Sequence, residues 1–405
     1  MQVDAKPKRL ENSHGTRARR CGILTVCVAL LLTVGVITLA VFTDRASHSM
    51  QFTTASFNAD AYSLTRTAPV GPFCAGESVT ATLEEGNSGN DAVCSVIAMR
   101  AAWDSPDTAL SIFGNANAAD NAKLTVDGTE VSYAVSADKK SITFNLPEQV
   151  LEAGSSNKPR DLTLTIPESF KSTGSVSFTF EKVVVGQEGG GFSETYDRNS
   201  EDPDIKALDY SAKVGWAASS LTAQNGKALM GYLTGKNAAG KYGIEFELAF
   251  GYTSSPMKDF ASRTDARWSH YKGAVDTLAF VEGMTSIGDY AFPDFTGVKS
   301  VSFPATVRTI GVSAFDASGL TGTVTIPATV KEIQSLAFGN LPNVKTFTFG
   351  HGSGDTLTLP DNTAAGKRNT GAFYVSSHVD TTVNSDVEAI QYGYKWHDGY
   401  DNRRL

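Results

Sequence analysis

One sequence pattern occurs three times between residues 280 and 338. The copies read FVEGMTSIGDYAF (280–292), FPATVRTIGVSAF (303–315) and IPATVKEIQSLAF (326–338). Each copy begins 23 residues after the one before it. A fixed period in this range is typical of a solenoid, in which similar units stack along one axis.

Four columns of apolar residues keep the 23-residue period and predict the core of this solenoid. A single unit cannot bury its own apolar surface, whereas stacked units share one continuous core. We expect each unit to supply a short strand, such as residues 300–303, to a parallel sheet. The predicted core residues are Leu278, Phe280, Ile287, Phe292, Val301, Phe303, Ile310, Phe315, Val324, Ile326, Ile333, Phe338, Phe347 and Phe349.

The residues that alternate with this core predict a face rich in hydroxyl groups. Successive side chains of a strand point to opposite faces, so these residues should point outward. We expect a flat, nearly uncharged surface that contacts a protein or a glycan. Ser and Thr also suit any exposed strand, and a surface without a partner is the alternative. The predicted face contains Thr277, Ser300, Ser302, Thr323, Thr325, Thr346 and Thr348.

The pattern I-P-x-x-V-x-x-I-G-x-x-A-F resembles the BspA-type (Treponema-type) leucine-rich repeat. Upstream, SPMKDF (255–260) and RWSHYK (267–272) resemble the cap that precedes such arrays. Ala266 stands where that cap often has proline. The resemblance implies a leucine-rich-repeat solenoid with a role in adhesion. We expect its N-terminal cap over residues 206–274, repeats over 275–350 and a C-terminal cap over 351–405.

Residues 51–185 show a different pattern, in which apolar and polar residues alternate strictly. Examples are SVTATL (78–83) and SVSFTF (175–180). This period of two, interrupted by Gly, Asn, Asp and Ser, predicts the half-buried strands of an antiparallel β-sandwich. The adjacent carboxylates Glu84 and Glu85 should point to opposite faces of a strand, and we interpret both as solvated surface.

The N-terminus predicts export. Residues 21–42 carry no charge, and Arg17, Arg19 and Arg20 precede them. Basic residues hold residues 1–20 in the cytoplasm, and the apolar run is long enough to cross a bilayer as a helix. This helix is either a signal peptide that signal peptidase cleaves between Ala40 and Val41, or a retained membrane anchor. In both cases the bulk of the chain is extracytoplasmic: secreted, or in the cell envelope.

The residues after this segment resemble a known group of exported proteins. AVFTD (40–44) and QFTTA (51–55) resemble the start of proteins that use the SipW-type signal peptidase, which include the camelysin/TasA family. NSGNDAV (87–93), followed by Trp103, is similar to a turn of the TasA-type domain. The resemblance implies a jelly-roll-like sandwich and self-assembly in an extracellular matrix.

Residues 186–205 are rich in glycine and then acidic, which is the composition of a flexible linker. A calcium loop formed by Glu201, Asp202 and Asp204 is the alternative, but these residues lack the alternating spacing of calcium ligands. Cys74 and Cys94 are the only cysteines after the apolar segment. In an exported chain they would form a disulfide. Two buried free thiols are the equal alternative.

No motif predicts catalysis. The six histidines include no pair with the spacing of a zinc peptidase helix, and no nucleophile elbow, phosphate loop or dinucleotide fingerprint occurs. His270 should pack beside Trp268 and Tyr271. We therefore expect no cofactor and no metal. A secreted camelysin-like peptidase and a single-pass membrane receptor are the alternatives.

The net charge of the chain indicates which kinds of partner it does not bind. The net charge is -8, and because the first 40 residues carry +4, the remainder carries -12. An acidic remainder argues against nucleic acid as a partner. The sequence therefore predicts a mainly β, exported, non-catalytic surface or matrix protein. It would bind surface or host proteins or glycans through its repeats and self-assemble through its sandwich.

Overall fold

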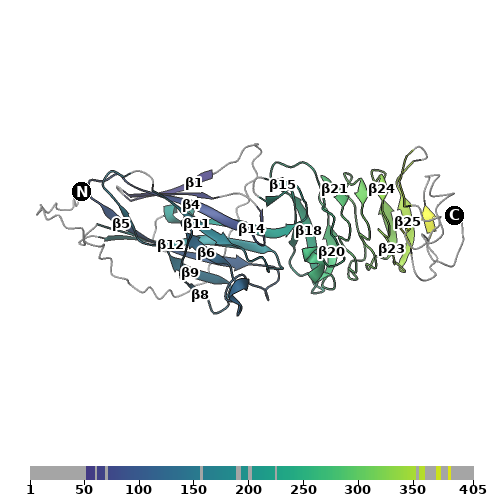
Figure 1. The fold of residues 1–405 in the computed structure, drawn as a ribbon, viewed down its shortest axis with the longest axis horizontal. Helices are drawn as coiled ribbons and strands as arrows, with labels where there is room; N and C mark the ends of the chain where they lie inside the picture. The colour runs from purple at the N-terminus through teal and green to yellow at the C-terminus, as the bar shows by residue number, and fades with distance from the viewer. Residues whose placement is uncertain are drawn as a thin grey trace, which may run out of the picture.

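The computed structural model describes residues 52–59, 62–68, 72–155, 158–187, 193–198, 203–223, 226–352, 355–360, 371–374 and 382–384. The molecule is elongated, with a β-sandwich at one end and a stack of repeat units at the other (Figure 1). The apolar segment 21–42 and its cleavage site at Ala40 and Val41 lie outside the described residues. Within the described residues, no helix has the length and apolarity needed to span a membrane.

Two sheets form the sandwich. The six-stranded sheet contains, in order, β1 (Phe52–Ala59), β2 (Tyr62–Ala68), β4 (Ser78–Asn87), β11 (Lys158–Thr165), β6 (Lys123–Val126) and β7 (Thr129–Glu130). The long sheet contains, in order, β20 (Val275–Ala279), β18 (Tyr242–Leu248), β17 (Leu229–Leu233), β14 (Tyr210–Ala217), β12 (Gly174–Gln187), β5 (Val93–Asp104), β9 (Ser141–Asn145) and β8 (Tyr133–Val135). Beside this path lie β10 (Gln149–Leu151), β13 (Ser193–Asp197) and β3 (Pro72–Cys74).

The predicted alternation explains how the two sheets pack. Along β4, Val79, Ala81 and Leu83 are buried, and the residues between them are more exposed. On the long sheet, Val176 and Phe178 of β12 belong to the same core. The prediction of a mainly β chain with a sandwich before the repeats is confirmed.

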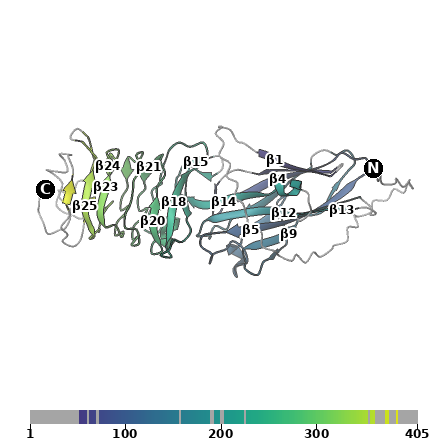
Figure 2. The same ribbon diagram turned by 180° about the vertical axis from the view of Figure 1, so that it is seen from behind.

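The long sheet continues past the sandwich into the repeats (Figure 2). β14 pairs with β12 on one side and β17 on the other, and β18 pairs in parallel with β20, the first strand of the array. The prediction of a flexible linker over 186–205 is wrong for the residues that the structure describes. These residues include β13 and the start of the short helix α1 (Pro203–Ala207). Ile205 and Leu208 are fully buried in the sandwich core, and a linker composition gave no sign of this.

Two smaller parallel sheets line the array. The corner sheet contains β19 (Ser255–Pro256), β21 (Met284–Ile287), β22 (Thr309–Ile310) and β24 (Glu332–Ile333). The three-stranded sheet contains β23 (Gly322–Ile326), β25 (Val344–Phe349) and β26 (Thr382–Asn384). The other short elements are the hairpin of β15 (Thr222–Ala223) and β16 (Gly226–Lys227) and the 3-10 turns η1 (Ala118–Asp120) and η2 (Arg267–Tyr271).

The predicted strand over residues 300–303 does not form. Phe303 still points into the core, where its ring stacks on Phe280 with centroids 6.1 Å apart. One backbone hydrogen bond, from the Thr321 amide to the Lys299 carbonyl, joins this segment to the next unit. At this edge of the unit side-chain packing replaces the strand ladder, and the sheet expected to run through every unit is interrupted here.

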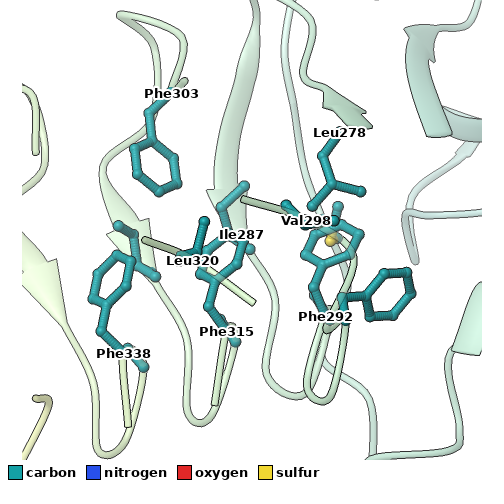
Figure 3. Close-up of a cluster of buried hydrophobic side chains, with 14 of the residues drawn as sticks. Leu278, Ile287, Phe292, Val298, Phe303, Phe315, Leu320 and Phe338 are labelled. Carbon is teal, nitrogen blue, oxygen red and sulfur yellow. The ribbon is translucent and has the colours of Figure 1, made fainter. Parts of the chain in front are cut away.

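Twelve of the fourteen predicted core residues are buried, and Phe280 and Val301 are half-buried against the same core. The phenylalanines at the A-F corners form a stack along the array (Figure 3). Phe292 and Phe315 have ring centroids 5.6 Å apart, and Phe338 and Phe373 have centroids 5.7 Å apart. One aromatic column therefore runs along the repeats.

The backbone at these corners repeats as regularly as the rings. The amides of Phe292, Phe315 and Phe338 each donate to the carbonyl one residue before the next phenylalanine, at 2.8 Å. Left-handed φ angles of 50–64° recur at two non-glycine positions of each unit, a conformation that costs free energy in other residues. These positions are Tyr290, Ser313, Leu336, Asp294, Ala317 and Asn340.

The array continues beyond the point where the sequence period breaks. Phe373 follows Phe338 by 35 residues, yet it occupies the next position in the stack. Thr358 forms a parallel bridge with Glu332 at the edge of the corner sheet, and β26 extends the three-stranded sheet. The segment expected to be a C-terminal cap therefore begins with a further repeat unit that carries insertions.

Candidate interaction surface

The three-stranded sheet aligns the predicted hydroxyl residues in two rows. Its register places Thr323 opposite Thr346, and Thr325 opposite Thr348. The same register continues to Thr382 and Asn384 of β26, which insertions displace from the 23-residue period. Neighbouring strands lie about 4.8 Å apart, so each row is a regular ladder.

The predicted face is exposed along the array. Val324 and Phe347, which alternate with the threonines, are buried. Thr346 and Thr348 are half-exposed, and the other five predicted residues are exposed. Thr277 lies on β20 of the long sheet, and the segment without a strand carries Ser300 and Ser302. The structure therefore places all seven residues on the outer side of the units, but only four of them share one hydrogen-bonded sheet.

Within the residues that the structure describes, most hydroxyls on this face have no hydrogen-bond partner. Thr277 donates to Asp276 at 2.9 Å. The others form no hydrogen bond within the described part of the chain: Ser300, Ser302, Thr323, Thr325, Thr346 and Thr348. The outer face of the six-stranded sheet differs, because its hydroxyls bond to each other across strands, as Thr80 and Thr163 do at 2.9 Å. The repeat face thus keeps its donors and acceptors available to a partner.

Charged side chains lie at the rim of this face. Lys299 is exposed, and its ammonium donates to the Thr296 carbonyl at 2.7 Å. Lys345 is also exposed, next to Thr346. The two hydroxyl rows themselves carry no charge, so direct recognition there depends on hydrogen bonding and shape.

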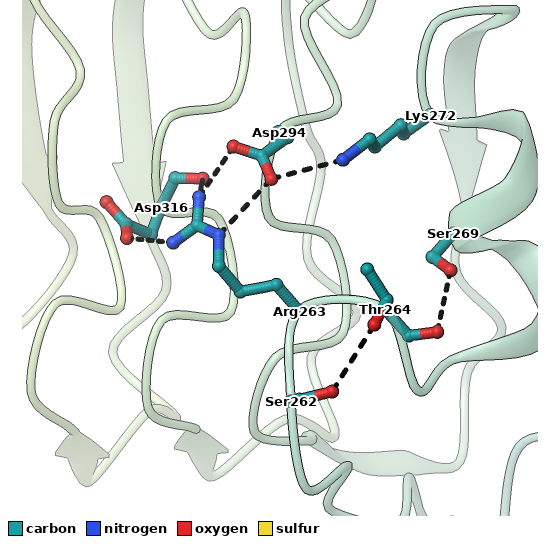
Figure 4. A network of polar contacts seen from close by, with 7 residues as sticks. All are labelled: Ser262, Arg263, Thr264, Ser269, Lys272, Asp294 and Asp316. Carbon is teal, nitrogen blue, oxygen red and sulfur yellow. Dashed lines mark hydrogen bonds and ion pairs between the residues drawn. The ribbon is translucent and has the colours of Figure 1, made fainter.

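A polar network joins the cap to the repeat units (Figure 4). Arg263 donates from Nε and Nη2 to the two carboxylate oxygens of Asp294, at 3.2 and 2.6 Å, and from Nη1 to Asp316. Lys272 reaches Asp294 at 3.4 Å, and the Asn340 amide donates to Asp316 at 2.8 Å. Residues from the cap and three successive units are therefore linked.

The electrostatics of this network indicate a structural role. The hydrogen bond from Arg263 is the main reason why the pKa of Asp294 lies below its usual value. The same pair raises the pKa of the Arg263 guanidinium. Because the guanidinium fork already holds two carboxylates, it has little capacity left for an anionic ligand.

The sandwich contains a buried ionic cluster that contradicts the interpretation of Glu85 as solvated. Glu85 is 0% exposed and forms an ion pair with Arg160, which is also buried. Tyr62 donates its hydroxyl to Glu85 Oε2 at 2.8 Å, and Ser95 donates to the same oxygen. Burial, then the charge of Glu85, raises the pKa of Tyr62. Glu85 follows Leu83 by two residues and so points to the same, buried face of β4. The alternation along this strand therefore indicates that Glu85 is buried.

The predicted disulfide between Cys74 and Cys94 is wrong, because Cys74 is a free, buried thiol. Cys74 lies beside Gly215, at the end of the long sheet where β5 finishes at Asp104. Cys94 lies at the other end of β5. Ten residues separate it from Asp104, which is about 33 Å of extended chain. A disulfide requires Cα atoms within about 7 Å.

The remaining histidine candidates form no metal centre in the part of the chain that is described. His270 lies edge-on to Tyr271, with ring centroids 5.2 Å apart, as expected. His351 is buried and hydrogen-bonds through Nε2 with the Val330 carbonyl at 2.6 Å. Across the described ranges, no group of three or more His, Cys, Asp or Glu could hold a metal ion.

Comparison with protein families identifies the repeats. Residues 269–393 match the family described as BspA type leucine rich repeat region, in six copies. The predicted C-terminal family is therefore confirmed, and the match includes the unit that carries insertions. The BspA-type family is not a catalytic family, which is compatible with a chain that is not an enzyme. The SipW-type signal and the TasA-like domain stay predictions.

Other comparisons add no function to the BspA-type array. No curated protein matches the chain. Solved structures with some likeness are AvmM, described as catalysing macrocyclization in alchivemycin A biosynthesis (15% identity, TM-score 0.23, 40% of this chain and 93% of that one), the yeast GGA1 GAE domain (7%, 0.18, 35% and 95%) and the collagen-binding domain of a Staphylococcus aureus adhesin (12%, 0.16, 39% and 99%). These TM-scores are too low to support an argument.

Proposed function

We propose that this chain is an exported, non-catalytic surface protein whose BspA-type array binds a protein partner through the hydroxyl face. The observation that carries the proposal is the exposed face on which six hydroxyls form no hydrogen bond within the described residues, four of them in two uncharged rows of one sheet. Ser and Thr provide adaptable donors and acceptors in protein recognition surfaces. Solenoids commonly use the extended surface of their stacked units for binding.

Replacing hydroxyls with charged side chains tests this face. The double variant Thr325→Lys, Ser302→Lys puts two ammonium groups into an uncharged row and should abolish binding of the fluorescently labelled chain to intact cells. Thr309→Lys with Thr358→Lys is the control, since both residues belong to the corner sheet or its edge and neither belongs to the hydroxyl rows. Equal binding by the two double variants would reject the hydroxyl face.

The chemistry of the partner is tested with the same cells. Protease treatment of the cells should remove the binding sites if the partner is a protein, whereas mild periodate, which cleaves vicinal diols of sugars, should leave them. Binding that resists protease but is lost after periodate would replace the protein partner with a glycan.

The proposed location is outside the cytoplasmic membrane. The uncharged run 21–42 after three arginines supports export. N-terminal sequencing of protein from the medium and from the cell envelope separates the two forms of the proposal. A chain that starts at Val41 is a cleaved product, and a chain in the membrane that retains residues 1–40 is anchored. Recovery of the intact chain from the cytosol alone would contradict export.

A further inference from the structure

We infer that the β-sandwich is itself the N-terminal cap of the repeat array, so that the two parts fold as one cooperative unit. The observation is that β14 belongs to both hydrophobic cores. Val214 lies in the sandwich core, and Trp216, two residues later on the same face of the strand, lies in the array core. Both side chains are 1% exposed.

Hydrogen bonding across the junction follows the same strand. The Trp216 indole donates to the Lys171 carbonyl at 3.0 Å, and the Leu233 amide of β17 donates to the Thr173 hydroxyl at 2.8 Å. Lys171 and Thr173 belong to the turn that precedes β12 of the sandwich. Two backbone segments of the array cap are therefore fixed to one sandwich turn.

A second set of contacts comes from η2 of the cap. Tyr271 donates its hydroxyl to Asp107 at 2.9 Å, and Arg267 pairs with Glu168 at 2.7 Å. The Tyr271 ring also lies 5.7 Å from Trp216 in the array core. The same aromatic side chain therefore closes the end of the array and contacts a sandwich loop.

The end of a solenoid requires a cap because its last unit would otherwise expose the core. Here the first aromatic layer contains Trp268, Phe246 and Trp216, and the strand that carries Trp216 is ordered by pairing with β12. Unfolding of the sandwich would remove that pairing and expose the layer. Independent domains are instead joined by linkers that few contacts cross.

The test compares hydrogen exchange in the wild type and in variants of the full-length chain. Leu164→Ala removes a fully buried side chain of β11, in the sandwich core. If the two parts unfold together, amides of β11 and of β18 and β20 should exchange faster by the same factor, at least tenfold. Faster exchange in β11 with unchanged exchange in β18 and β20 would overturn the inference.

Two further variants keep this test decisive. Phe349 lies at the far end of the array, where units can open locally. The variant Phe349→Ala should therefore accelerate the hydrogen exchange of amides in β25 more than in β11. If Leu164→Ala fails to fold, Ile142→Val removes a single methylene from the same core and is read by the same criterion. Acceleration confined to the sandwich in that variant would also overturn the inference.

Discussion

Phe315 stacks on Phe338 with ring centroids 5.5 Å apart and planes within 7° of parallel, although 23 residues separate them. Both rings are buried, and each contacts a further phenylalanine on its other side. We expect Phe315→Ala to destabilise the chain by about 3–5 kcal/mol, because it leaves a cavity in the middle of the column. Urea unfolding measures this loss. Thr323→Ala is the control, and it should change the unfolding free energy by less than about 0.5 kcal/mol.

Replacement of Arg263 should reduce the change in folding stability between neutral and acid pH. The folded pKa of Asp294 is depressed, so its pairing stabilises the fold above the unfolded pKa, near 3.9. That contribution is lost as pH falls through the still lower folded pKa. The stability difference between the wild type and Arg263→Gln should therefore be largest near neutral pH and shrink below about pH 4. A difference that stays constant from pH 7 to pH 2.5 would show that the pair does not contribute electrostatically.

The buried ion pair of Glu85 and Arg160 should make a single substitution cost more folding stability than the double substitution. Arg160→Met leaves an uncompensated carboxylate in the core and should cost about 3–5 kcal/mol. The double variant Glu85→Leu, Arg160→Met should recover much of that loss, because it removes both charges. Thermal unfolding of the four proteins in the cycle measures the coupling. Additive losses would argue against the ion pair.

Cys74 should be unreactive in the folded chain. Burial, and next the charge of Glu77, raises the pKa of its thiol to about 12, so the thiolate that alkylating reagents require is scarce at pH 8. Iodoacetamide should modify Cys74 only after denaturation, and peptide mapping without reductant should yield no peptide that joins Cys74 to Cys94. Recovery of that linked peptide would restore the disulfide that the sequence suggested.

The repeat array was predictable because each unit is stabilised by its sequence neighbours. Ile287, Ile310 and Ile333 keep one period, and all three are buried. The missing strand at residues 300–303 could not be predicted. Strand pairing depends on backbone geometry, and units with the same side-chain pattern differ in that geometry. The place of Thr382 was hidden by insertions between Phe338 and Phe373.

The sandwich was harder to predict, since its strands pair over long sequence distances. Alternation predicted that β4 has a buried face, but nothing local shows that β14 joins β12 to β17. The interpretation of Glu85 failed for another reason. Its charge favours the surface, whereas its position in the alternation of β4 places it in the core. For the hydroxyl face, the sequence predicted the residues but not which of their hydroxyls remain unbonded.

The regular corners give the array a modular length. Each corner junction between units uses the same donors, the same acceptors and the same pair of left-handed positions, so the corners of one 23-residue unit match those of the next. A duplicated copy of residues 303–325, placed after Thr325, would meet compatible corners on both sides. It would advance the C-terminal end by one strand spacing, about 4.8 Å, and so set the reach of the protein in small, equal steps.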